Sequence, residues 1–431
     1  SEDTPDILAI AGTTGVYPLD LDGDHITDLA ILRVGEDRLL RGLGNCQFAP
    51  FDDIGFESGD HWTTAFSATW EPGQSLPTLA FGTYVDRSNP DGPFETCDAT
   101  LLYRPDGNTY RQVEELQPGY CALSMLFTNW HRSEEDDQRG RADLRISNDR
   151  HYYVRGGQEQ MWAMTETPYL YATEDGWASY QLWGMGIASR DIDGDGFSDV
   201  YLTSMGDQKF QLFDPTQGGP AYSDVTYAFG TTAHRPSTGG DGRPSTGWHA
   251  DFGDVNNDGR DDIFVSKGNV EQMPTAAMRD PNTLLLQDEN GRFRDFAADA
   301  GIATMERSRG AVLRDLNRDG QLDLAVVNRR ASLELYENTT VGSGNHLFVE
   351  VIGDPPNTAA IGAFVEVRTE NRTHTRELTI GGGHAGGSAG PVHFGLGAAE
   401  TVALRILWPD GQKTKWQTVA ANQNITVRQS D

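Results

Sequence analysis

Short acidic loops of a single pattern occur four times in the sequence and offer its clearest chemistry. The copies read DLDGDHITDL from Asp20, DIDGDGFSDV from Asp191, DVNNDGRDDI from Asp254 and DLNRDGQLDL from Asp315. Each copy has oxygen-bearing side chains at positions 1, 3, 5 and 9, a glycine at position 4 or 6, and an apolar stretch directly afterwards. Alternating carboxylates and amides on so short a loop can direct their oxygens into one space, where they would hold a cation.

Calcium is the cation that this set of ligands predicts. Hard oxygen donors, to which position 7 can add its backbone carbonyl, suit Ca²⁺ better than zinc or a softer metal. An EF-hand does not fit, because its loop has twelve residues, ends in Glu and lies between helices. One such loop could be a solvated turn, but four copies with one spacing predict about four calcium ions. The predicted ligands are Asp20, Asp22, Asp24, Ile26 and Asp28; Asp191, Asp193, Asp195, Phe197 and Asp199; Asp254, Asn256, Asp258, Arg260 and Asp262; and Asp315, Asn317, Asp319, Gln321 and Asp323.

The elements that must position these loops read as short strands in a repeated order. A full repeat has one strand before the loop, a second strand directly after it, a third strand, and a last strand that begins aromatic-x-Asp, as at Phe293. Four-stranded repeats of about 50 to 60 residues are typical of propeller blades, which close into a ring and leave no open sheet edge.

The spacing of the loops predicts six blades, with seven as the alternative. The last three loops are evenly spaced, but the first interval is nearly three times as long and should contain two degenerate units, at residues 68–79 and 129–144. The sixth unit lacks a last strand of its own. Residues 6–15 resemble residues 295–304, so the N-terminus is expected to complete the last blade.

Longer stretches of the sequence resemble known families. The Asp-x-Asp-x-Asp-Gly loops followed by short strands look like the FG-GAP or VCBS repeats of integrin α-subunit propellers. The tail resembles the ASPIC/UnbV domain that follows such repeats in cartilage acidic protein and in many bacterial secreted proteins. It carries Gly344-Asn-His-Leu-Phe-Val-Glu-Val, His393-Phe-Gly-Leu-Gly and Leu407-Trp-Pro-Asp-Gly. The resemblance implies a calcium-binding β-propeller over residues 1–340 and an ASPIC/UnbV-like β-domain over residues 344–431, and it implies no shared activity.

The tail by itself reads as a small antiparallel β-sandwich, because apolar residues alternate along its strands, as at Val402, Leu404 and Ile406. The predicted fold class is therefore all-β, a propeller followed by this domain. One stretch departs from the family pattern. Where the family usually has an aromatic residue and a serine, this chain has a glycine-rich turn at residues 381–387, so no ligand role is carried over to that turn.

The net charge of the chain limits the classes of partner that it is expected to bind. Lys and Arg number 34 and Asp and Glu number 64, which gives a formal net charge of −30. This surplus argues against binding nucleic acid through a basic surface and favours cations. No apolar run is long enough to span a membrane, so no membrane insertion is expected.

The start of the chain and its cysteines bear on the compartment. The chain begins at Ser1 without a methionine, as a mature protein does after signal-peptide removal, so a secreted, extracellular or periplasmic location is expected. In an oxidising compartment two of the three cysteines can pair. Cys97 with Cys121 is the expected pair, which leaves Cys46 odd.

Two kinds of function fit the sequence. The favoured one is a non-enzymatic extracellular module that uses its calcium-binding propeller for adhesion to, or binding of, a protein or glycan. The alternative is an enzyme that acts on a carbohydrate or other small polar substrate at the mouth of the propeller channel. The family architecture would place Trp248, His249 and Arg309 at one mouth, which makes His249 a candidate acid or base and Arg309 a candidate anion ligand. The competing interpretation of His249 is an imidazole that fills space at a blade junction.

Overall fold

The structure is a computed structural model that describes residues 6–90, 96–111, 113–132, 141–149, 154–232 and 242–430. The described chain is built almost entirely from strands, so the all-β prediction is confirmed. The described residues contain no helix with the length and apolar character of a membrane span. The helical segments are η1 (Asp6–Leu8), η2 (Asp52–Ile54), η3 (Thr173–Asp175) and α1 (Thr226–Phe229).

The first 23 strands form consecutive groups that we call the first to sixth units. Each unit places its first strand innermost and continues outward through antiparallel neighbours. The first unit has β1 (Thr13–Leu19), β2 (Asp28–Gly35), β3 (Arg38–Gly42) and β4 (Phe48–Pro50); the second has β5 (His61–Thr69), β6 (Thr78–Thr83), β7 (Thr100–Tyr103) and β8 (Glu114–Leu116). The third has β9 (Ala122–Thr128), β10 (Asp143–Asn148), β11 (Gln160–Ala163) and β12 (Tyr169–Leu170). The fourth has β13 (Gly184–Arg190), β14 (Asp199–Ser204), β15 (Lys209–Phe213) and β16 (Tyr222–Asp224); the fifth has β17 (Gly247–Gly253), β18 (Asp262–Lys267), β19 (Thr283–Gln287) and β20 (Phe293–Asp295); the sixth has β21 (Ser308–Arg314), β22 (Asp323–Asn328) and β23 (Glu334–Tyr336).

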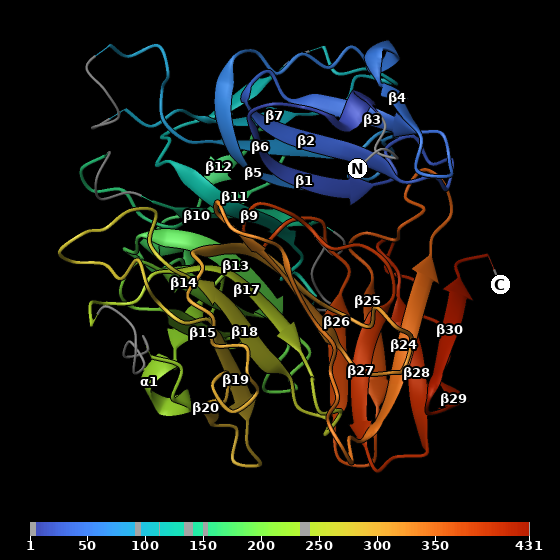
Figure 1. The fold of residues 1–431 in the computed structure, drawn as a ribbon. Helices are drawn as coiled ribbons and strands as arrows, with labels where there is room; N and C mark the ends of the chain where they lie inside the picture. Colours follow the sequence, from blue (N-terminus) through green and yellow to red (C-terminus); the bar gives the residue numbers. More distant parts are fainter. Residues whose placement is uncertain are drawn as a thin grey trace.

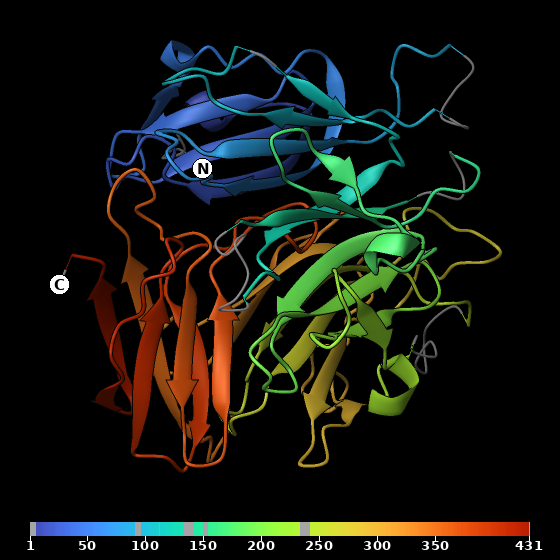
Figure 2. The ribbon, with the colours of Figure 1, turned by 180° about the vertical axis from the view of Figure 1, so that it is seen from behind.

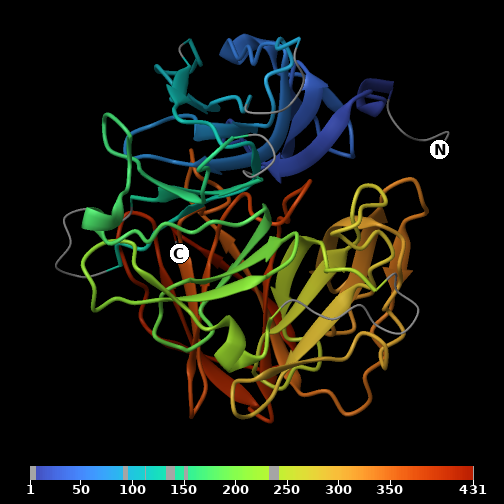
Figure 3. The same cartoon turned by 90° about the vertical axis from the view of Figure 1, so that its left-hand side faces the viewer.

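Neighbouring units pack face to face and share their apolar cores. Leu126 and Met161 of the third unit pack with Ile187 and Leu202 of the fourth, and similar shared clusters join the fourth unit to the fifth and the fifth to the sixth. Figure 1 shows the units in sequence from blue through green to yellow, and Figure 3 shows the green and yellow sheets side by side. Both faces of the second strands are covered, which explains why β14 and β18 are buried along their whole length.

The first two units are not separate sheets. Val34 of β2 pairs with Trp62 of β5, so strands β1 to β8 belong to one eight-stranded sheet. The count of six distinct blades therefore stays a prediction.

The closing of the ring by the N-terminus also stays a prediction. The sixth unit has three strands, and in the described part of the chain no further strand pairs with β23. The first described residues form η1, and β1 then pairs with β2 of its own unit. Residues 1–5, which would supply the closing strand by analogy with β20, lie outside the described residues.

The tail forms two further sheets beside the units, drawn in orange and red in Figure 2. Their shared core contains Leu347, Val365, Phe394 and Ile406. One sheet has the order β27 (Val392–Gly397), β24 (Asn345–Ile352), β30 (Gln423–Arg428); the other has the order β26 (Thr373–Glu377), β25 (Phe364–Arg368), β28 (Thr401–Leu407), β29 (Gln417–Ala420).

The tail is not antiparallel throughout, which corrects the sequence-based expectation. Strands β24 and β30 run parallel, with Leu347 opposite Gln423 and Val351 opposite Val427. Parallel neighbours need a long crossover connection. Here the whole of the second sheet lies between them in the sequence, and no local pattern of alternation reveals that pairing.

The cysteine pairing predicted from the sequence is confirmed. Cys97 and Cys121 form a disulfide, and Cys46 is free and exposed. The bond links the second unit to the residue just before β9, so it ties two neighbouring units together.

Candidate metal sites and the propeller channel

Each acidic loop joins the first strand of its unit to the second. The last aspartate of each loop is also the first residue of β2, β14, β18 or β22. The tight turn needs a left-handed backbone at Gly194 (φ 83°) and Gly259 (φ 88°), a conformation that glycine adopts without steric cost. Since the loops occupy equivalent places in their units, they lie at the same end of the inner strands.

The last aspartate of each loop fastens the loop to its own sheet. Asp199 accepts hydrogen bonds at Oδ2 from the backbone N–H of Ile192 (2.8 Å) and at Oδ1 from that of Phe213 (2.9 Å). The same two bonds recur in the other loops, at Asp28, Asp262 and Asp323. All four carboxylates are buried. The ninth position therefore shapes the loop as well as being a predicted ligand.

The first and fifth aspartates hold the turn itself. Asp191 accepts hydrogen bonds from the backbone N–H of Gly194 (2.8 Å) and Gly196 (3.2 Å), and Asp195 accepts one from Phe197 (2.8 Å). Equivalent bonds reach Asp20, Asp254 and Asp315 at the first position. The seventh residues donate their N–H to the fifth aspartate, and their role as carbonyl ligands stays a prediction for Ile26, Phe197, Arg260 and Gln321.

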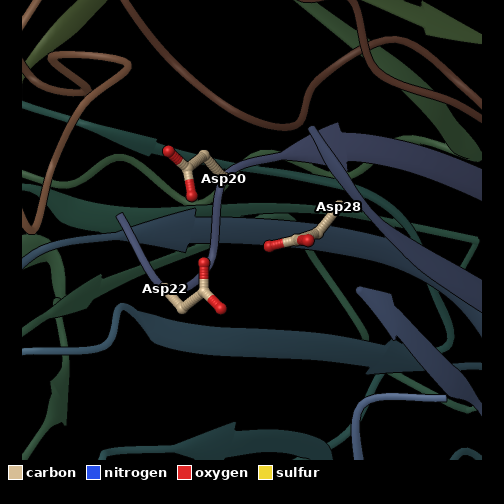
Figure 4. A group of neighbouring side chains, drawn as sticks. All are labelled: Asp20, Asp22 and Asp28. Carbon is tan, nitrogen blue, oxygen red and sulfur yellow. The ribbon is translucent and has the colours of Figure 1, made fainter. Parts of the chain in front are cut away.

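Carboxylates converge in two of the loops. One oxygen each of Asp20, Asp22 and Asp28 lie within 4.8 Å of one another, and Figure 4 shows these side chains turned toward a common space. The fourth unit brings its loop carboxylates together in the same way, at Asp191, Asp193 and Asp195.

The loops of the fifth and sixth units contain one carboxylate fewer. Position 3 is Asn256 or Asn317, and its amide oxygen accepts the backbone N–H of the fifth residue, Asp258 (3.1 Å) or Asp319 (3.0 Å). An amide offers the same kind of oxygen as a carboxylate without its charge. These loops therefore present the same donor atoms with less mutual repulsion.

The protein offsets the charge of the loop carboxylates only in part. Arg41 pairs with Asp22 and Arg260 with Asp258. Burial, together with neighbouring loop carboxylates, raises the pKa of Asp28 to about 7 and the pKa of Asp199 and Asp254 to about 8. A bound divalent cation would favour the ionised form of the same groups. The residues thus fit calcium, because every side-chain donor is a hard oxygen and no side chain supplies the missing positive charge at Asp199 and Asp254.

In the degenerate loop of the third unit, side chains of the protein surround the carboxylate. Asp143, which begins β10, receives hydrogen bonds at Oδ2 from Trp130 Nε1 (2.9 Å), His131 Nε2 (3.1 Å) and the Tyr171 hydroxyl (2.8 Å). The Nε of Arg141 lies 3.1 Å from its Oδ1. Residues 133–140 of this loop lie outside the described residues.

The second unit lacks the aspartate that begins the second strand of every other unit. Thr78 stands at the start of β6, and its hydroxyl donates to Glu71 Oε1 (2.7 Å). Arg104 donates its Nε–H to the same carboxylate oxygen at 2.7 Å. A side-chain ion pair therefore closes this loop.

A glycine-rich segment of the tail runs across the inner strands of several units. In this segment, the glycine tract (residues 379–390), Ile380 bridges to Ala68 of β5 and Gly383 to Ile187 of β13; further bridges join Gly381 to Leu126 of β9 and Gly386 to Val16 of β1. The fit is too close for side chains. A Cβ on Gly381 would come within 2.6 Å of the carbonyl oxygen of Met125. The tract therefore lies inside the channel of the propeller and packs against the inner strands.

Comparison with known proteins supports the reading of the tail. Residues 353–431 match the protein family described as ASPIC and UnbV. This match confirms the resemblance found in the sequence. No curated protein sequence matches the chain significantly.

Several solved structures align with most of the chain at low similarity. An Agrocybe aegerita lectin that recognises non-reducing terminal N-acetylglucosamine is 14% identical, with 76% of this chain and 81% of that chain covered and a TM-score of 0.39. BBS1N, solved in complex with ARL6DN, is 12% identical, with coverages of 77% and 94% and a TM-score of 0.33. The Dos1 propeller is 8% identical, with coverages of 84% and 88% and a TM-score of 0.34. These scores support no inference about function.

The ASPIC/UnbV-like domain contacts the acidic loops directly. The Thr358 hydroxyl donates to Asp20, and Arg372 donates to the carbonyl oxygen of Ile192. Glu377 accepts the backbone N–H of Asn129 at 2.6 Å, at the start of the degenerate third loop. The loops are thus the surface on which the domain rests as well as candidate metal sites.

The proposed catalytic residues are held in structural contacts. His249 Nδ1 accepts the backbone N–H of His384 at 2.9 Å, and burial lowers the pKa of His249. Arg309 donates to the carbonyl oxygen of Gly268 (2.9 Å), and its guanidinium lies 3.9 Å from the ring centroid of Trp248. Burial, together with nearby arginines, lowers the pKa of Arg309 to about 9.

The pocket expected at this mouth is not found in the described part of the chain. Apolar side chains pack around Trp248 instead, including Tyr84, Leu123, Met185 and Met205. His249 does line a large cavity, but neither Trp248 nor Arg309 does. The channel-mouth enzyme hypothesis therefore loses the geometry on which it depended.

No sequence-based prediction included the packing of the glycine tract against the units. The density of glycine between residues 381 and 390 is the signal that could have indicated close packing against backbone. The same stretch, Gly386-Gly-Ser388-Ala-Gly390, matches the Gly-x-Ser-x-Gly pattern of hydrolase elbows. It joins two strands, β26 and β27, with no helix following it, so the strand-turn-helix context of such a nucleophile is missing.

Proposed function

We propose that the chain is a secreted, calcium-loaded β-propeller that acts as an extracellular binding or adhesion module for a protein or a glycan. The observation that supports calcium most strongly is the convergence of Asp20, Asp22 and Asp28 within 4.8 Å, which recurs in the loop of the fourth unit. A propeller joined to an ASPIC/UnbV-like domain is consistent with a binding or structural module.

Calcium has a structural role in this proposal. The first, third, fifth and ninth residues of each loop would bind the ion through side-chain oxygens and the seventh through its carbonyl. The ion offsets the repulsion between carboxylates that folding brings together. A site whose free calcium is at 100 times the dissociation constant adds about 2.7 kcal/mol to the free energy of unfolding.

Two further observations support the extracellular part. The Cys97–Cys121 disulfide is typical of proteins from an oxidising compartment. The net charge of −30 suits a partner that does not depend on a basic surface. Because the glycine tract occupies part of the channel, we propose that a protein or glycan partner contacts the outer faces of the units.

Metal analysis of the purified protein tests the calcium part. About four calcium ions per chain and a large fall in the unfolding midpoint after chelation are expected. Magnesium at the same concentration should restore the midpoint less well, because its smaller ion demands a stricter octahedral geometry. A chain without bound calcium, with an unchanged midpoint in chelator, would contradict the proposal.

Binding arrays of extracellular proteins and glycans test the partner. The calcium-loaded chain is expected to bind a member of one array and to lose that binding in chelator, because metal-free loops release the units that carry the surface. If the loaded chain binds neither array, the module has another function.

A further inference from the structure

A large cavity lies between the inner strands of the units and the ASPIC/UnbV-like domain. Its volume of about 660 Å³ is within the usual range for small-molecule sites. The inner strands β1, β13, β17 and β21 line it, together with β24 and the glycine tract. Exposed residues such as His25, Glu350 and Ser388 stand on its lining, so the cavity is open to solvent.

Two opposite charges on the wall of this cavity have no ionic partner. Asp251 of β17 accepts a hydrogen bond at Oδ2 from the backbone N–H of Leu313 (3.0 Å). Arg314 of β21 donates from Nη1 to the carbonyl oxygen of Pro391 (2.8 Å). Among the described residues neither side chain forms an ion pair. The two groups nevertheless lie close enough for their charges to attract each other.

Some other enclosed charges of the molecule are held in ion pairs. Arg376 lies 2.9 Å from Asp261, and Lys267 lies 3.2 Å from Asp280. Burial raises the pKa of Asp251, as expected where the surroundings do not fully compensate a charge. Enclosed charges are rarely left without a partner unless a ligand supplies it.

A third polar group faces the same space. His249 Nδ1 accepts the N–H of His384, which assigns the proton of the neutral imidazole to Nε2. His249 lies two residues before Asp251 on β17, so both side chains emerge on the same face of the strand. The nearby walls are apolar, with Leu126, Ile187 and Phe252 among the lining residues.

We propose that this cavity binds a small zwitterion with an apolar body, namely an apolar amino acid or a short apolar peptide with free termini. The ligand carboxylate pairs with Arg314 and accepts the Nε2–H of His249, and its ammonium group pairs with Asp251. Of the other charged residues on the lining, Arg190 lies 3.7 Å from Asp261, and Glu377 accepts hydrogen bonds from Thr128 and Asn129. Asp251 and Arg314 therefore offer one negative and one positive charge that no ion pair engages, which complements a zwitterion. This pair is a poor match for a dianion or for a neutral sugar, either of which would leave a charge without its partner.

The test is calorimetric titration of the full chain in calcium with four probes and the dipeptide leucyl-leucine. L-leucine carries both charges, leucinamide only the ammonium, N-acetyl-leucine only the carboxylate, and glucose neither. We expect L-leucine or the dipeptide leucyl-leucine to bind, and the singly charged probes to bind about tenfold more weakly or not at all, because each loses one charge-assisted hydrogen bond.

Two variants test which group of the ligand each of the two charges binds. Arg314→Gln should abolish the advantage of L-leucine over leucinamide, and Asp251→Asn should abolish its advantage over N-acetyl-leucine. Arg294→Gln, an exposed position on β20, is the matched control and should bind as the parent does. Since Arg314 also contacts Pro391, each variant is compared with the parent in its unfolding midpoint.

Three outcomes would overturn the proposal. They are no binding of L-leucine or leucyl-leucine at millimolar concentration, equal binding of the four probes, or binding that is unchanged in both cavity variants. The probes address the parent protein directly, so the conclusion does not depend on the variants folding. It is also independent of the calcium proposal, because calcium content and probe binding are measured separately.

Discussion

The loops of the third and fourth units occupy the same place in their sheets and satisfy their carboxylates in opposite ways. At Asp143, burial raises the pKa, but the hydrogen bond from His131, a backbone N–H and the charge of Arg141 together lower it below its ordinary value. At Asp199, which accepts backbone N–H groups, burial and neighbouring carboxylates raise the pKa to about 8.

The difference shows when a loop of this kind needs a positive charge from a bound cation. Where the chain supplies a histidine and an arginine, the carboxylate is stable as an anion without help. Where the chain supplies only more carboxylates, the positive charge must come from outside the chain. The second unit differs from both, since Thr78 replaces the aspartate at the start of the second strand and an Arg104–Glu71 pair closes the loop.

The largest effect should follow from removing the carboxylate of the third unit. Asp143→Ala leaves His131, Arg141 and the Trp130 indole N–H without their acceptor, so we expect a loss of about 3 to 5 kcal/mol in the free energy of unfolding. The loss, measured by denaturant titration, should be equal with calcium and in chelator. Asp207→Ala, at an exposed site, is the control. A loss that depends on calcium would remove the distinction between the two kinds of loop.

The metal-free protein should respond to pH through its acidic loops. The folded-state pKa of about 8 for Asp199 and Asp254 lies above the unfolded value. Their stabilisation is therefore present when they are protonated and is lost as the pH rises through 8. In chelator, the free energy of unfolding should fall by up to about 1.4 kcal/mol per pH unit for each group.

Saturating calcium should abolish this dependence, because bound ligands are already deprotonated. Asp143 should not contribute in the same window, since its pKa is lowered and its stabilisation is lost only in acid. Stability measured from mildly acidic pH up to a pH of about 8, with and without calcium, distinguishes the two. A slope of the same size in both conditions would show that other groups are responsible.

The effect of Asp195→Asn on the free energy of unfolding should differ between the calcium-loaded and the metal-free protein. With calcium, a site weakened tenfold loses about 1.4 kcal/mol at saturating ion. In chelator, the variant should be as stable as the parent or slightly more stable, because burial and the nearby charges of Asp193 and Asp191 raise the pKa of Asp195 to about 6. Asp193→Asn should have a smaller effect, as asparagine occupies position 3 in two other loops. Equal losses with and without calcium would argue for a purely structural aspartate.

The smallest effect should come from the second unit. Arg104→Met removes a partly exposed ion pair with Glu71, so we expect a loss of about 1 kcal/mol or less. Thermal melts with calcium and in chelator should show the same loss, because this loop has no carboxylate at the start of β6. Arg111→Met, at an exposed position, controls for the change in net charge.

Local patterns explain why much of the fold could be predicted. The acidic loops begin and end where their spacing indicates, since a turn followed by a strand depends on residues that are neighbours in the sequence. The Cys97–Cys121 pair was also expected and is confirmed. The convergence of Asp20, Asp22 and Asp28 follows from the same short spacing.

Long-range contacts explain what could not be predicted. His249 was expected at an open channel mouth, but its partner is His384, 135 residues away. The parallel pairing of β24 with β30 joins strands at opposite ends of the tail. Neither relation has a local signature, because it depends on how the tail packs against the units.

The sequence by itself determined the strand repeats, the four acidic loops and the chemistry of their donors, because each depends on a few consecutive residues. Only the tertiary structure decided that the glycine tract lies inside the channel, that the ASPIC/UnbV-like domain rests on the loops, and that Asp251 and Arg314 face one cavity. Those relations arise from burial and backbone packing between segments far apart in the chain. Residue type and spacing do not specify which distant segments meet.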